Sequence, residues 1–226
     1  MGPLGAGGLV DETQVGVKLH PRVLGRPQLS VLRRLGPFLE RSPFYLAGGT
    51  ALALHLAHRR SVDFDWFSEH PLGDPLGLAA EIQGSGLPLE VTSVEKGTLH
   101  GRSAGVRLSF LEYRYPLLAP VIPTREPGLR LASLEDIATM KLAAVVQRGS
   151  RKDFVDVFAL GRSLGLDAML TLYRRKYGVR DIGHVIISLA YFDDAEGERM
   201  PAMIRHWSWA TMKRAIQSWV RQVTVR

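Results

Sequence analysis

The sequence predicts an α+β fold in which a small mixed β-sheet with flanking helices is followed by a helical C-terminal part. Short runs that alternate apolar and polar residues, as in half-buried strands, lie before residue 130. After Leu131, apolar residues recur every three to four positions, as in amphipathic helices. A proline-rich connecting segment over residues 116–127 separates the two regions. We therefore expect a core domain over 19–130 and a helical domain over 131–226, preceded by a flexible Gly-rich leader over 1–18.

The first region contains both kinds of element. Helices are expected at residues 28–40, 51–58 and 78–83, the second of which is rich in Ala and Leu. Strands are expected at residues 44–47, 61–67, 89–94, 98–101 and 106–113. The last three of these strands follow one another through short turns, so we expect them to form an antiparallel meander.

The second region is expected to be entirely helical. Ser133, followed by Glu135 and Asp136, is typical of a capped helix start, and Gly149 ends the helix that begins there. Ser150 can cap the next helix. Helices are expected at residues 134–147, 151–160, 167–177, 181–191 and 207–220.

Composition limits the class of protein. The chain has 226 residues, of which 46% are hydrophobic and 23% charged, which excludes a disordered or collagen-like chain and a membrane bundle. Cysteine is absent, so a disulfide framework, a thiolate zinc site and a cysteine nucleophile are excluded. The N-terminal stretch lacks the basic and apolar regions of a signal peptide, and no window has the ~18 apolar residues of a membrane span. We expect a cytoplasmic protein without membrane contact.

The charge of the chain favours a polyanionic partner. Lys and Arg number 29 against 22 Asp and Glu, a net charge of +7. From Ser133 onward there are 15 basic and 10 acidic residues, so most of the excess lies in the helical part. Basic excess favours nucleotides or RNA through electrostatic steering and counterion release, although many basic proteins bind neither.

The most informative constellation is Gly48-Gly49-Thr50, a short helix, and then Asp63 and Asp65 on an expected strand. Residues two apart on a strand face the same way, so both carboxylates project together. Paired carboxylates suit a hard divalent cation such as Mg²⁺, which also binds substrate phosphates. A glycine turn at a helix N-terminus offers backbone N–H groups to a phosphate. Taken alone, an Asp-x-Asp pair is more often a solvated strand face, and a Gly-Gly turn only a turn.

Two ordered blocks of sequence resemble the AbiEii/AbiGii-type toxin nucleotidyltransferases of the DNA polymerase beta-like superfamily. The first is YLAGGTALALH at 45–55 with RSVDFDWF at 60–67. The second is DIATMKLAA at 136–144 with RGSRKDFVD at 148–156. The resemblance extends over roughly residues 29–192. It implies a nucleotidyltransferase core whose sheet holds the metal-binding acids, closed over the nucleotide by the helical part.

The resemblance also implies roles for individual residues. Asp63 and Asp65 are expected to bind Mg²⁺ and Gly48, Gly49 and Thr50 to hold the triphosphate, with Arg60 and Ser61 beside them. Lys141 and Lys152 are expected to contact phosphate or the attacking strand, and Asp153 belongs to a Lys-Asp motif. From spacing alone, Lys152 and Asp156 are four apart, which is also typical of an ion pair on a solvated helix face.

One departure from the superfamily concerns a third carboxylate, which members often carry on a neighbouring strand. In the expected strand 106–113 the acidic residue is Glu112, which is either a third metal ligand or an exposed edge residue.

The expected activity is Mg²⁺-dependent transfer of a nucleotide from a nucleoside triphosphate to an acceptor such as tRNA, with release of pyrophosphate. By analogy with the family, an antitoxin is an expected partner. Two alternatives stay open: a catalytically weak relative that binds nucleotide or RNA without transfer, and a basic RNA-binding regulator.

Overall fold

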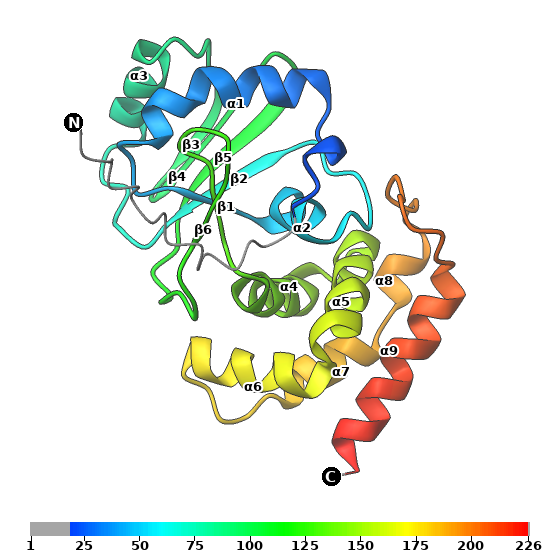
Figure 1. Cartoon of the computed structure of the whole chain (residues 1–226). Coiled ribbons are helices and arrows are strands. Elements are labelled where there is room, and N and C mark those ends of the chain that lie inside the picture. Colours follow the sequence, from blue (N-terminus) through cyan, green and yellow to red (C-terminus); the bar gives the residue numbers. More distant parts are fainter. Residues whose placement is uncertain (1–18, 226) are drawn as a thin grey trace, which may run out of the picture.

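The computed structural model describes residues 19–225, so the expected leader lies outside the described residues. A seven-stranded sheet with the order β3-β4-β5-β2-β1-β7-β6 forms the first part of the molecule (Figure 1). The strands are β1 (Tyr45–Ala47), β2 (Phe64–Ser68), β3 (Glu90–Glu95), β4 (Thr98–Ser103), β5 (Val106–Glu112), β6 (Ile122–Pro123) and β7 (Arg130–Leu131).

The sheet is mixed, as expected. β3, β4 and β5 form the predicted antiparallel meander, and β5 pairs parallel with β2. β2 then pairs antiparallel with β1, and β1 pairs parallel with β7. β2 therefore lies at the centre of the sheet, where its alternate residues Phe64 and Trp66 are fully buried.

The two faces of the sheet have different neighbours. Helices α1 (Arg26–Leu39) and α3 (Pro75–Gly84) cover one face (Figure 1), where Phe38 of α1 packs edge-on against Phe110 of β5. Helix α2 (Gly48–Leu56) follows β1 directly and contacts α4 (Leu134–Arg148) on the other side. This second face carries Asp65 and Phe67 of β2 and faces the helical part.

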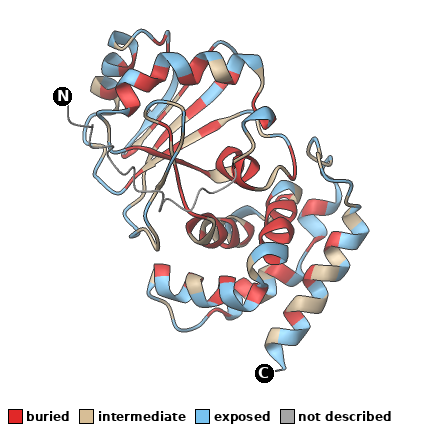
Figure 2. Ribbon diagram, viewed as in Figure 1, coloured by how far each residue is buried: buried red, intermediate tan, exposed pale blue. Residues whose placement is uncertain are grey.

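All elements named after β7 are helices, in agreement with the prediction. They are α4, α5 (Arg151–Leu164), α6 (Leu166–Tyr177), α7 (Gly183–Ala190), α8 (Asp193–Glu196) and α9 (Trp209–Thr224). Buried residues are concentrated where α2, α4 and α5 meet (Figure 2). A buried ion pair joins the first turn of α4 to α6: Nζ of Lys176 lies 2.6 Å from Oδ1 of Asp136.

The structure differs from the prediction in details that matter for the site. Helix α2 begins at Gly48, so both glycines form its first turn, and β2 begins at Phe64, one residue after Asp63. Two short strands were not expected: β6 lies within the proline-rich connecting segment, and β7 follows it. Within residues 19–225 no helix is both long enough and apolar enough to cross a membrane.

Candidate active site

Asp63 and Asp65 lie at the start of the central strand. Asp65 is the second residue of β2, and Asp63 immediately precedes the strand. Their neighbours Phe64 and Trp66 point into the core. Because strand residues alternate between faces, Asp65 projects from the face opposite to that covered by α1. The predicted side-by-side placement of the two carboxylates is thus compatible with the strand geometry.

The glycine turn packs directly against these acids. Gly48 has φ +65°, and a Cβ atom added there would lie 2.8 Å from Oδ2 of Asp65. A Cβ on Gly49 would lie 3.0 Å from Oγ of Ser61. The hydroxyl of Thr50 donates a hydrogen bond to the backbone oxygen of Asp63. The structure therefore brings together the two acids and most of the residues expected to hold a triphosphate.

Asp65 is surrounded by basic groups of the helical part. Burial raises the pKa of the Asp65 carboxyl, and the negative charge of Asp63 raises it further. The charges of Lys141 and Lys152 and a hydrogen bond from Ser109 oppose this rise. A bound cation would remove the cost of ionising a buried carboxyl, so the electrostatics of Asp65 favour a positively charged ligand.

The neighbouring strand β5 does not supply a third acid. Ser109 is the register partner of Asp65, and Arg107 of the same face binds Asp63 through both carboxylate oxygens, at 2.9 and 2.7 Å. Glu112 instead pairs in register with Ser68 and accepts a hydrogen bond from the backbone N of Leu72.

The expectation that Glu112 supplies a third metal ligand is therefore wrong. Glu112 lies three residues beyond Ser109, hence on the other face of the strand and farther along it. Its carboxylate pairs with Arg114. Among the described residues, no group of three or more His, Asp or Glu side chains is placed to hold a metal ion.

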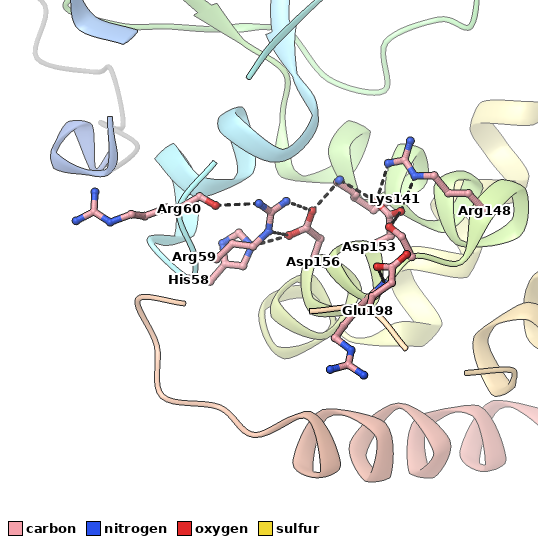
Figure 3. A network of polar contacts seen from close by, with 10 residues as sticks. His58, Arg59, Arg60, Lys141, Arg148, Asp153, Asp156 and Glu198 are labelled. Carbon is pink, nitrogen blue, oxygen red and sulfur yellow. Dashed lines mark hydrogen bonds and ion pairs between the residues drawn. The ribbon is translucent and has the colours of Figure 1, made fainter. Parts of the chain in front are cut away.

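A buried network is centred on Asp156 (Figure 3), and Arg59 connects it to the glycine turn. Asp156 of α5 is fully buried and receives two hydrogen bonds from Arg59, with Nε at 2.6 Å and Nη2 at 2.7 Å. His58 donates from Nε2 at 2.8 Å, and Nζ of Lys141 lies 2.7 Å away. Burial lowers the pKa of His58, whereas Lys141 and Arg59 hold the pKa of Asp156 well below its usual value.

The same network explains the position of Asp153. Asp153 is buried and accepts hydrogen bonds from Arg148, at 2.7 and 2.9 Å, and from Ser150 at 2.6 Å. Lys141 lies between the two acids, 3.3 Å from Oδ1 of Asp153. Asp153 therefore does not face the glycine turn. It holds the side chains of Lys141 and Arg148 in position, and the charges of both interact with Asp65.

Lys152 and Arg60 have different surroundings. Lys152 is exposed and makes no ion pair with another described residue, and its positive charge acts to lower the pKa of Asp65. The solvated Lys152–Asp156 pair that the spacing allowed is absent, because Asp156 is turned into the core. Arg60 points away from the network (Figure 3).

Arg59, the neighbour of Arg60, takes the position at the turn, since a Cβ on Gly49 would meet its Nη2 at 2.6 Å. Arg59 and Arg107 are the site residues that sequence reasoning missed. Arg59 stands next to an arginine that was considered, but its partner Asp156 is 97 residues away. Arg107 lies two residues before Ser109 on β5, and an arginine at that strand position has no motif that marks it as part of the site.

Comparison with known proteins identifies the family. Residues 102–216, just over half of the chain, match the family described as nucleotidyl transferase AbiEii toxin of type IV toxin–antitoxin systems. The chain belongs to the AbiEii nucleotidyltransferase toxin family. The matched stretch contains Arg107, Lys141, Lys152 and Asp156, whereas the glycine turn and the two aspartates precede it.

A relative and two solved structures extend the comparison. An uncharacterized protein of Aquifex aeolicus is 36% identical over 190 residues, which cover 82% of this chain and 91% of that protein. MenT4, a nucleotidyltransferase toxin of Mycobacterium tuberculosis, shares the fold with a TM-score of 0.60 and 15% identity, covering 87% and 82% of the two chains. The antibiotic-resistance factor ANT(2″)-Ia has a TM-score of 0.52 and 17% identity, covering 67% of this chain and 93% of its own.

This AbiEii protein is therefore a nucleotidyltransferase by family, and its fold is that of nucleotidyltransferases. Enzymes that transfer phosphoryl-type groups generally use divalent metal ions. The residues present fit such an ion: two carboxylates supply hard oxygen ligands, and Gly48 leaves the space beside Oδ2 of Asp65 that a Cβ would fill. Arg107 on Asp63 shows that this carboxylate already holds a positive group.

Proposed function

We propose that the protein transfers a nucleotide from a nucleoside triphosphate to a hydroxyl of an RNA acceptor such as tRNA, in a Mg²⁺-dependent reaction. The packing of the glycine turn against the two aspartates, with basic residues of α4 and α5 around them, carries this proposal. The basic excess of the helical part supports a polyanionic acceptor.

In this reaction the acceptor oxygen forms a bond to the α-phosphorus, the bond from that phosphorus to the bridging oxygen breaks, and pyrophosphate leaves. The hydroxyl proton is lost to solvent. Asp63 and Asp65 would hold Mg²⁺, which neutralises the phosphates and helps the acceptor oxygen to attack. Such transfer depends mainly on positioning and charge, and both can come from the residues described here.

Other residues have supporting roles. The first turn of α2 presents the backbone N–H groups of Gly49 and Thr50 to the triphosphate at the positive end of the helix dipole. Lys152 is free to bind phosphate. Lys141 and Asp153 set the charge and position of the groups around Asp65. Ser61 lines the turn, and Arg60 is available to bind the acceptor from outside the network.

The direct test incubates the protein with Mg²⁺, each α-labelled nucleoside triphosphate in turn, and total RNA. We expect label in RNA with the wild type and none with the Asp63→Asn/Asp65→Asn double variant, whose melting curve should show that it folds. Label transfer by the double variant would disprove the assignment of the acids.

The missing third carboxylate favours one competing function, namely nucleotide or RNA binding without transfer. In that case neither protein labels RNA, but the wild type still binds nucleoside triphosphate in an equilibrium assay. We also propose a cognate antitoxin as a partner, because the family is one of type IV toxin–antitoxin systems. We propose the cytoplasm as the location, since RNA and nucleoside triphosphates are found there. Co-expression with the neighbouring gene products would test for the antitoxin by relief of growth inhibition.

A further inference from the structure

We propose that Arg107 is a resident counter-ion of Asp63 that competes with the divalent metal ion, so that the metal binds only as Arg107 leaves the carboxylate. This inference rests on the metal role proposed above for Asp63 and Asp65. It adds a residue that sets how tightly the site binds metal.

The contact between Arg107 and Asp63 has the geometry of a specific pair. Nε of Arg107 donates to Oδ1 at 2.9 Å and Nη2 donates to Oδ2 at 2.7 Å. This two-pronged arrangement is the most favourable one for a guanidinium and a carboxylate. It occupies both oxygens of one of the two acids that the metal needs.

Arg107 lies on β5, the strand beside the two acids on which a third metal-binding carboxylate was expected. Arg107 and Ser109 lie on the face of β5 that adjoins Asp65, and Ser109 is the register partner of Asp65. The strand that borders the acids thus contributes a hydroxyl and a guanidinium but no carboxylate. The site has two negative side chains, and the guanidinium of Arg107 neutralises one of them.

Electrostatics then decide between the two cations. A divalent ion beside Asp63 and the guanidinium of Arg107 repel each other, so the bound metal and the intact ion pair exclude one another. The pair is also able to open, because the side chain of Arg107 is 60% exposed and that of Asp63 30% exposed. Solvent screens a pair this exposed, even one with two hydrogen bonds, so its contribution is small enough for a divalent ion to displace Arg107. A triphosphate that arrives with the metal gives the released guanidinium a new partner.

The test measures Mn²⁺ binding by electron paramagnetic resonance, which requires no turnover. Arg107→Gln removes the competing charge and leaves a shorter, uncharged polar side chain. We expect it to lower the dissociation constant for Mn²⁺ by at least about threefold, the scale set by the strength of such a pair. Arg107→Lys retains the charge and loses the two-pronged contact, so a smaller gain is expected.

The matched control is Arg102→Gln. Arg102 is the register partner of Arg107 on β4 and is exposed, so its removal changes the local charge equally without breaking a contact to Asp63. We expect no more than a marginal effect on Mn²⁺ affinity. A melting curve for each variant verifies that the fold is retained.

The outcomes separate this inference from the proposed function. If Mn²⁺ binding depends on Asp63 and Asp65 but Arg107→Gln leaves it unchanged or weakens it, the competition is disproved and the metal site stands. An equal gain in Arg102→Gln also disproves it, since the effect would then be one of general charge. If neither the wild type nor Arg107→Gln shows binding that depends on the two acids, the metal site itself is disproved.

Discussion

Gly48 shows how a single backbone position shapes the candidate site. Its left-handed conformation is strained for any residue with a side chain, and the space on its open side is taken by Oδ2 of Asp65. The sequence identified the glycine turn and the Asp-x-Asp pair as parts of one constellation. It gave no indication that they touch, because that depends on the antiparallel pairing that sets Ala47 beside Asp65.

Replacement of Gly48 by alanine is expected to lower the free energy of unfolding by about 1–2 kcal/mol, the cost of the left-handed conformation. It should also weaken Mn²⁺ binding, since the new methyl group displaces Asp65. Chemical denaturation and a Mn²⁺ titration measure the two effects. Gly84→Ala, in helix α3, is the control, because nothing lies within 4 Å of the added atom; it should leave Mn²⁺ binding unchanged and raise the free energy of unfolding slightly, if at all. Unchanged stability in Gly48→Ala would contradict the strain argument.

Lys152 differs from the other basic residues near Asp65 in being exposed and unpaired among the described residues. Lys152→Gln is expected to weaken binding of nucleoside triphosphate severalfold and to alter stability by less than about 0.5 kcal/mol, as is usual for surface changes. Isothermal titration calorimetry measures the affinity. Lys96→Gln, at an exposed turn between β3 and β4, serves as the control. Equal affinities for the wild type and Lys152→Gln would remove Lys152 from the phosphate-binding set.

At the scale of elements, the network around Asp156 joins α4 and α5 to the segment between α2 and β2. The helices and the meander could be predicted because periodicity, caps and glycine stops are local properties. β6 and β7 could not, since two-residue strands have no period and are defined only by their partners. The same holds for Asp156, whose spacing from Lys152 suggested a solvated pair, whereas its partners come from two other elements.

Asp156→Asn is expected to lower the free energy of unfolding at pH 7 by about 3–5 kcal/mol, because it leaves Arg59 buried without its counter-charge and Lys141 with only the more distant Asp153. The pKa of Asp156 is depressed by folding, so its stabilising effect is complete above about pH 4, the pKa of an unfolded Asp. As the pH falls below that value, the effect is progressively lost. Denaturation at pH 7, 5 and 3 should therefore show a constant deficit at the first two and a smaller one at the third.

The control for this series is Asp194→Asn, an exposed acid at the start of α8. It should differ little from the wild type at any of the three pH values. A deficit in Asp156→Asn that grows toward low pH would show that the carboxylate is not stabilised in its ionised form.

At the scale of the whole molecule, the chain has a net charge of +7, with the greater part of the excess after Ser133. The sheet part contributes the two acids together with Arg107 on Asp63, and the helical part contributes Lys141 and Lys152, whose charges act on Asp65. The composition predicted the basic excess of the helical part. It could not predict which cations are already used in ion pairs inside the fold, as Lys141, Arg148 and Lys176 are.

RNA binding should accordingly depend steeply on salt. For four phosphate contacts with single-stranded RNA, the affinity is expected to fall about 50-fold between 50 and 200 mM monovalent salt. Fluorescence anisotropy with a labelled RNA measures this slope. The Asp63→Asn/Asp65→Asn variant should show at least the wild-type affinity, because it loses negative charge only. An affinity independent of salt would show that the basic excess does not contact RNA.

The long separation between Arg59 and Asp156 has a consequence for the order in which the protein is made. A nascent chain that has left the ribosome as far as Gly149 already contains both glycines and both aspartates of the site. Its Arg59 still lacks Asp156, and Lys141 lacks both of its acidic partners. The glycine turn therefore gains its support only once α5 has been synthesised, so the site matures late in translation.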